Sequence, residues 1–190
     1  MALTKEQIEK FKEAEKEAQD SDDFREVAKN IAEAGDKEWA KKTYEKVEEK
    51  AKDYSQFESL ANDICEKLGD KDWGKKLYKK AESKAEGFWE INQVADSICE
   101  KLGDKEWAIK LYQKAEKNAE DCSDFIRLAD SIYGNLGDKD WVKILYKQAE
   151  EKAEDSSDYE SLAESLRDQL GDKKWAKLAD QKAKELEDDE

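Results

Sequence analysis

A unit of 34 residues repeats along this chain and constrains its fold more than any other feature. Five glycines are spaced by 34 residues, and each is followed by Asp-Lys, then one variable residue, then Trp. The glycines are Gly35, Gly69, Gly103, Gly137 and Gly171, and the tryptophans are Trp39, Trp73, Trp107, Trp141 and Trp175. Self-similarity at a fixed period of this length indicates a repeat architecture, in which each unit buries its apolar side against its neighbours.

Within each unit, apolar residues recur twice with the period of a helix. In the second unit Trp73, Leu77 and Ala81 are spaced by four residues, and a second stripe runs from Ile91 to Ile98. Each repeated glycine stands where a helix would end in the left-handed conformation, and the Asp after it is placed to cap the next helix. The pattern therefore predicts two helices per unit and no strands.

We expect an all-α fold of about eleven helices, an α/α solenoid of helix-turn-helix repeats. A single hairpin of this length cannot bury its own apolar stripe, so the units must stack and share a core. The prediction is one domain over residues 1–190, with an N-terminal capping helix over 1–20 and five hairpins over 21–190. The predicted helices, with ends uncertain by about 2–4 residues, are 4–19, 22–33, 37–52, 55–67, 71–86, 89–101, 105–120, 123–135, 139–154, 157–169 and 173–187.

Composition limits what such an array could bind. The chain has 50 acidic and 35 basic side chains and a net charge of −15, which opposes a nucleic acid as partner. It contains no apolar run of about 18 residues and no charged-then-apolar leader. We therefore expect no membrane contact, no signal peptide and a cytoplasmic setting.

The residues that support catalysis or metal binding are mostly missing. Histidine is absent, which excludes His-based triads, His general bases and most zinc sites. Cys65, Cys99 and Cys122 form no Cys-x-x-Cys pair and are best interpreted as small packing residues. Each of the five repeated glycines precedes an Asp, whose carboxylate would repel a phosphate. We expect a protein that is not an enzyme and that carries no cofactor and no metal.

The unit resembles the tetratricopeptide repeat (TPR), whose pattern is similar to Ala108, Tyr112 and Ala115 in one helix and to Phe125, Leu128, Ala129 and Ile132 in the other. The resemblance covers about the whole chain. It departs from the family because the proline that usually ends the repeat is missing, and because the turn before each glycine is one residue longer, except from Ile31 to Gly35. The resemblance implies a right-handed array in which the first helix of each pair lines a concave binding groove.

We call the residue pattern shared by the 34-residue units the lattice. Several residues on that first helix differ from this pattern. Trp89 is the only tryptophan off the 34-residue period, and it stands where other repeats have Ser. Ile126 replaces the Glu of the capping boxes predicted at Ser55 and Glu58 and at Ser157 and Glu160, and Tyr133 replaces Cys or Arg. Local rules broken repeatedly on one predicted face are typical of a functional site. The candidate partner-binding residues are Trp89, Asn92, Gln93, Asp96, Ile126, Arg127, Asp130 and Tyr133.

These observations predict a non-enzymatic scaffold that binds a peptide or protein in a groove centred on the second and third repeats. The acidic residues that the sequence places around this groove favour a partner with basic residues around an apolar anchor. Burial of the Trp89 indole would contribute up to roughly 4–6 kcal/mol, from about 150–250 Å² at about 25 cal/mol per Å².

Three alternatives stay open. In one, Trp89 is a packing residue in an altered turn, and Gly87 or Glu90 supplies the helix cap. In another, the regular lattice and the absence of Pro and His indicate an engineered TPR-like scaffold, with no ligand and no native compartment. In the third, the chain self-associates through apolar residues of the second helices, namely Ile109, Val142 and Ile144.

Overall fold

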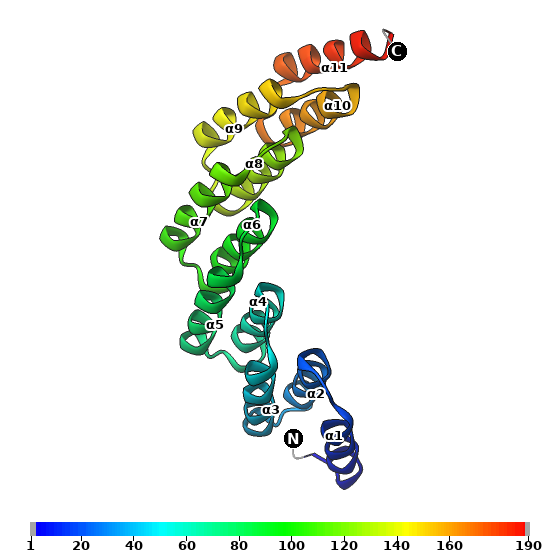
Figure 1. The fold of residues 1–190 in the computed structure, drawn as a ribbon, viewed down its shortest axis with the longest axis vertical. Helices are drawn as coiled ribbons and strands as arrows, with labels where there is room; N and C mark the ends of the chain where they lie inside the picture. Colours follow the sequence, from blue (N-terminus) through cyan, green and yellow to red (C-terminus); the bar gives the residue numbers. More distant parts are fainter. Residues whose placement is uncertain (1–2, 189–190) are drawn as a thin grey trace. The chain divides into compact units, whose positions relative to one another are not determined.

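The computed structural model describes residues 3–188, and every regular element in that range is a helix (Figure 1). All eleven predicted helices are present, and each begins within one residue of its predicted start. The all-α helical-repeat prediction is therefore confirmed. The helices are α1 (Lys5–Glu17), α2 (Ser21–Glu33), α3 (Lys37–Lys50), α4 (Tyr54–Asp63), α5 (Lys71–Lys84), α6 (Phe88–Ser97), α7 (Lys105–Asn118), α8 (Cys122–Leu136), α9 (Lys139–Lys152), α10 (Ser156–Ser165) and α11 (Lys173–Asp188), and the π-helical turns η1 (Ile64–Leu68), η2 (Ile98–Leu102) and η3 (Leu166–Leu170) extend three of them.

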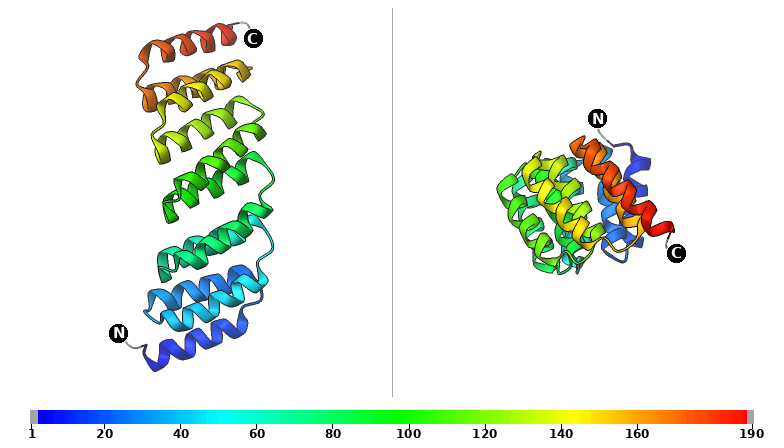
Figure 2. Two further views of the ribbon diagram at one scale, coloured as in Figure 1. Left: turned by 90° about the vertical axis from the view of Figure 1, so that its left-hand side faces the viewer. Right: turned by 90° about the horizontal axis from the view of Figure 1, so that it is seen from above.

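The helices pack in consecutive pairs. We call the first helix of each pair A-type (α2, α4, α6, α8, α10) and the second B-type (α3, α5, α7, α9, α11). The chain forms two compact units: an N-terminal unit of Met1–Glu86 and Glu100–Gly103, and a C-terminal unit of Gly87–Cys99 and Asp104–Glu190. In the C-terminal unit α6 contacts α8 and α8 contacts α10. Figure 2 shows the helices of this unit from two further sides. The single domain over residues 1–190 stays a prediction.

The extra residue before most lattice glycines is absorbed by a π-helical turn. In η1 the N–H of Gly69 donates to the carbonyl oxygen of Ile64, five residues earlier, at 3.0 Å. In the first repeat, where the stretch is one residue shorter, the N–H of Gly35 donates to Ala32 at 3.0 Å. Gly69 has a φ of +76°, a left-handed conformation that side-chain-bearing residues adopt only with strain.

The helix caps follow the prediction for B-type helices and depart from it for A-type helices. Asp36, which begins α3, accepts the N–H of Trp39 at 2.9 Å, as expected. The A-type helices α4 and α10 are capped by Asp53 and Asp155, so the capping boxes predicted at Ser55 and Ser157 are wrong. An Asp two residues before the serine reaches the exposed N–H groups of the first turn, and the serine is already inside the helix.

Indole hydrogen bonds join successive B-type helices. Trp73 Nε1 donates to Glu48 at 2.7 Å, and Trp141 Nε1 donates to Glu116 at 3.0 Å. Trp39 Nε1 makes the same contact with Glu15 of α1, at 3.2 Å. Helix α1 therefore occupies the place of a B-type helix, and this identifies the predicted capping helix as half of a repeat.

Cys65 and Gly74 form a complementary pair in the second repeat. A methyl group at Gly74 would overlap Sγ of Cys65, and the first repeat places Ala32 and Ala40 at the same two positions. We expect Gly74→Ala to be less stable than the Cys65→Ala/Gly74→Ala double variant by about 1–2 kcal/mol, because overpacking a core strains it. Urea unfolding measures the difference, and equal stability of the two variants would contradict the assignment.

Candidate partner-binding surface

The eight candidate residues all lie on α6 and α8, within the C-terminal unit. The structure divides them into two groups. Some are exposed on the surface that the two helices share, and the others are used inside the seam that joins the helices.

Trp89 and Arg127 form the exposed contact. The indole of Trp89 on α6 is 50% exposed, and the guanidinium carbon of Arg127 on α8 lies 4.3 Å from its ring centroid. A guanidinium at this distance from an indole face makes a cation–π interaction. Trp89 and the candidate residue Arg127 therefore meet, and together they present an aromatic face and a positive charge to solvent.

The local chain explains why Trp89 is free to take this position. Gly87 is the N-cap of α6 and contributes no side-chain cap, whereas Asp121 caps α8 with its carboxylate. At position 87 this helix therefore has Gly where α8 has the capping Asp121. Trp89 replaces only an exposed residue of the first turn. Phe88 is buried, and it is this ring that covers the core in the altered turn.

Asp96 holds α6, α7 and α8 together from within. Its carboxylate accepts the hydroxyl of Tyr112 at 2.7 Å, the amide of Asn135 at 2.9 Å and the hydroxyl of Ser131 at 3.0 Å. Asn92 is 3% exposed, and its amide nitrogen donates to Ser131 at 2.9 Å inside the protein, while its Oδ1 is buried without a partner. Asn92 and Asp96 therefore position the surface and do not form it.

Ser131 and Asn135 were missed by the sequence analysis, although one signal was available. Asn135 stands where neighbouring repeats have Lys67 and Lys101, so it also breaks the lattice. It was not recognised because the TPR resemblance directs attention to positions earlier in the helix.

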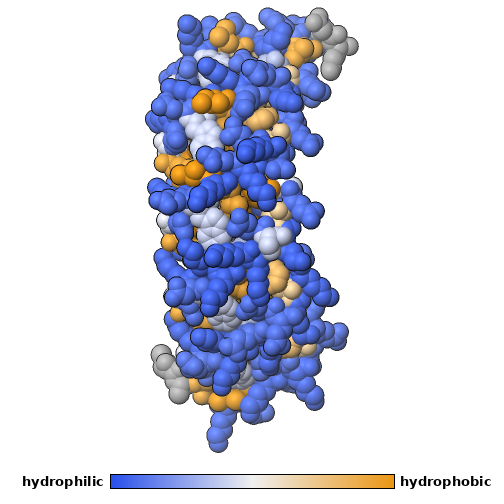
Figure 3. Space-filling view, turned by 60° about the vertical axis from the view of Figure 1, so that its left-hand side comes forward, coloured by the Kyte–Doolittle hydropathy of each residue, from blue (hydrophilic) through white to orange (hydrophobic). Residues whose placement is uncertain are grey.

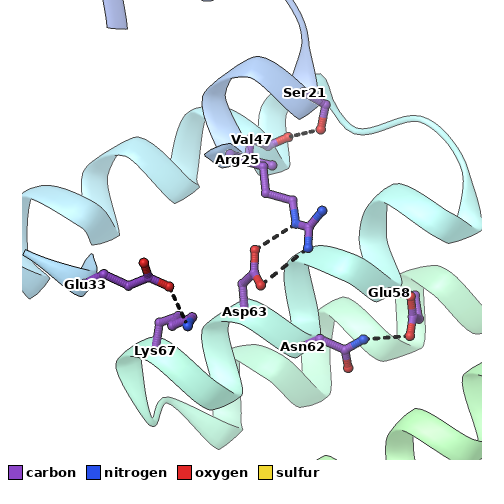
Figure 4. A network of polar contacts seen from close by, with 8 residues as sticks. All are labelled: Ser21, Arg25, Glu33, Val47, Glu58, Asn62, Asp63 and Lys67. Carbon is purple, nitrogen blue, oxygen red and sulfur yellow. Dashed lines mark hydrogen bonds and ion pairs between the residues drawn. The ribbon is translucent and has the colours of Figure 1, made fainter. Parts of the chain in front are cut away.

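Ile126 is a candidate partner-binding residue that the structure buries. It is 8% exposed, and the equivalent residues Glu58 and Asn92 are 4% and 3% exposed. In the first pair of A-type helices this position is Arg25, whose Nε donates to Asp63 of α4 at 2.7 Å (Figure 4). The position thus lies in the seam between successive A-type helices. Ile126 is a packing residue, and we remove it from the candidate surface.

The last three candidates, Asp130, Tyr133 and Gln93, are each half-buried. Oδ1 of Asp130 accepts the hydroxyl of Tyr146 at 2.7 Å, and burial raises the pKa of its carboxyl despite this bond and the nearby Arg127. The ring of Tyr133 is half-buried and lies 5.9 Å from the ammonium of Lys139. Gln93 is half-buried on α6.

The three cysteines are packing residues, as predicted. Cys99 and Cys122 are buried and Cys65 is half-buried, and none is in a disulfide. Burial raises the pKa of the Cys122 thiol to about 12. A thiol with so high a pKa is not a nucleophile at neutral pH.

Among residues 3–188 there is no cluster of three or more His, Cys, Asp or Glu side chains that could hold a metal ion. Within the same range no helix has the length and apolar character needed to cross a membrane. Comparison of the sequence with protein-family models and with curated proteins found no match.

Asp130→Asn should separate the positioning role of this side chain from its charge. The variant keeps an acceptor for Tyr146, as Asn62 does for Tyr78 in the second repeat. Since the folded-state pKa of Asp130 is raised, its favourable contribution is full below the ordinary value of 3.8 and is lost as pH rises through the raised pKa. We expect urea unfolding to give similar stabilities at pH 3, and the Asn variant to gain on the wild type as pH rises to 7. A constant difference across this range would contradict the assignment.

Proposed function

We propose that this protein is a non-enzymatic scaffold, and that the surface of α6 and α8 binds a peptide or protein segment. One observation supports this most strongly: Trp89 is half-exposed at a position that three other repeats fill with serine, and Arg127 is stacked on it. The exposed half of this indole adds nothing to the stability of the free protein. Aromatic and arginine side chains of this kind are enriched among residues that dominate binding energy.

The exposed half of the indole limits what binding can gain from it. Covering about 100 Å² at about 25 cal/mol per Å² contributes roughly 2–3 kcal/mol, about half of what full burial of an exposed indole would give. This corresponds to a factor of roughly 30–150 in affinity. Trp89 can therefore anchor a ligand of weak to moderate affinity but cannot by itself produce a tight complex.

Charge indicates the chemistry of the partner. The protein carries a net charge of −15, and Glu160 and Glu164 are exposed on α10, the A-type helix that follows α8. Arg127 is the one positive group that we place on the candidate surface. A segment with an apolar or aromatic side chain for Trp89, basic residues toward α10 and a carboxylate toward Arg127 matches this arrangement.

Trp89→Ser, which restores the lattice residue, should weaken binding about 30-fold or more while leaving the free energy of unfolding within about 0.5 kcal/mol of the wild type. The ligand is the strongest binder selected from a displayed peptide library on the wild-type protein. Its dissociation constant is measured by calorimetry.

The matched control is Ile144→Lys, which also restores a lattice residue and removes an exposed apolar side chain, but on α9. Loss of binding in Trp89→Ser and in Arg127→Ser, with Ile144→Lys unchanged, supports the proposed surface. Equal binding by all variants would remove it, and would favour an engineered scaffold with no ligand surface on these helices.

Self-association is a second candidate, with a revised set of residues. Ile144 on α9 and Leu178 on α11 are each 55% exposed and are lattice equivalents, 34 residues apart. Val142, named for this role from the sequence, is fully buried and drops out, and Ile109 is half-buried. Figure 3 shows separate hydrophobic groups among hydrophilic residues on one face.

If Ile144 and Leu178 mediate association, light scattering should report a mass that increases with concentration for the wild type. The Ile144→Lys/Leu178→Lys variant should then stay monomeric, because the two added charges oppose burial of these positions in an interface. A monomeric wild type at every concentration would eliminate this candidate.

A further inference from the structure

A groove of 390 Å³ lies between α1 and α2, in the N-terminal unit. Four residues of α1 and its end form one wall, and four residues of α2 form the other. They are Lys10, Ala14, Glu17 and Ala18, and Asp23, Glu26, Val27 and Asn30.

The repeat itself identifies what fills such a groove. Because α1 occupies the place of a B-type helix, the pair α1 and α2 corresponds to the pair α3 and α4, 33 residues later. There the groove holds an A-type helix, α2. Its Ser21 hydroxyl donates to Val47 of α3 at 3.5 Å, and its Arg25 donates to Asp63 of α4. Val47 and Asp63 correspond to Ala14 and Asn30 of the groove.

The opposite end of the described chain differs in character. There a cavity of 470 Å³ between α10 and α11 is lined by Glu160, Ser161, Glu164, Arg167, Asp168 and Asp180. Arg167 forms an ion pair of two hydrogen bonds with Asp180, at 2.8 and 3.1 Å, and Asp180 stands where the other repeats have a buried tyrosine. The α1–α2 groove instead keeps Ala14, Ala18 and Val27.

We propose that the groove between α1 and α2 binds an amphipathic helix of a partner protein, in the way that α3 and α4 hold α2. The incoming helix presents small or medium apolar residues to the two alanines and Val27. Its position equivalent to Trp89 faces Glu26, because Glu26 corresponds to Arg127, which contacts Trp89 from the following A-type helix. The groove has three carboxylates and one ammonium, so this position is basic in the partner.

Two peptides test the proposal. Each has the sequence of residues 20–34, which includes a natural occupant of the equivalent groove, and one carries Asp22→Lys at the position that faces Glu26. Fluorescence anisotropy of the labelled peptides against the full-length protein should show saturable binding, weak because a free helix of this length is marginal in water. The Lys peptide should bind up to about fivefold more tightly, the range of one exposed ion pair.

Charge reversal in the protein locates the site. Glu26→Lys should invert the preference, so that the unmodified peptide binds more tightly than the Lys peptide. Glu45→Lys on α3 makes the same change of charge at an exposed residue outside the groove and should preserve the wild-type order. Circular dichroism confirms that both variants are folded.

The outcomes are decisive and independent of the proposed function. No saturable binding of either peptide at millimolar concentration overturns the proposal. Binding whose preference Glu26→Lys does not invert also overturns it, because the peptide then occupies another place, such as that of α2 itself. Trp89→Ser should leave both peptides unaffected, since it lies in the other compact unit.

Discussion

Within each compact unit, a helical pair leaves one side uncovered and the next pair covers it; most other features of the structure follow from this constraint. A hairpin of about 30 residues has no second layer of its own to bury its apolar stripe. Its interior tyrosines are fully buried only because the A-type and B-type helices pack on both sides of them. The same constraint makes the ends of an array special, because an end helix has a face for which the repeat supplies no neighbour.

Burial of the tyrosine row creates a second requirement. Each buried hydroxyl needs an acceptor, and the A-type helix of the same pair supplies one: Asn62 for Tyr78, Asp96 for Tyr112 and Asp130 for Tyr146. In the first repeat the hydroxyl of Tyr44 is buried without a partner. In the pair of α6 and α7 the requirement expands into the network of Asp96, and this network fixes α6 against α8. A well-satisfied polar network specifies one packing arrangement more strictly than apolar contact does. The exposed Trp89 and Arg127 depend on it for their relative position.

Local interactions made much of the fold predictable. Helix periodicity, left-handed glycines and the Asp caps of B-type helices act over a few residues, so the pattern that encodes them can be recognised directly. The errors were also local in origin. Ser55 and Ser157 have the right chemistry for a cap, but the chain enters the helix two residues earlier, at Asp53 and Asp155. Ile126 was misassigned because its departure from the repeat pattern was taken as a sign of a binding surface, and the equivalent Glu58 is itself buried.

The sequence alone determined the number of helices, their boundaries within a residue or two, the repeat register and the residues that break it. It determined these because hydrogen bonds within a helix and caps at its ends connect residues that are close in the chain. Only the tertiary structure decided which irregular residues are accessible. Trp89 and Ile126 both break the lattice on A-type helices, yet Trp89 is exposed and Ile126 is buried. The difference arises because exposure depends on whether another helix covers a position, and residues more than thirty positions away determine that.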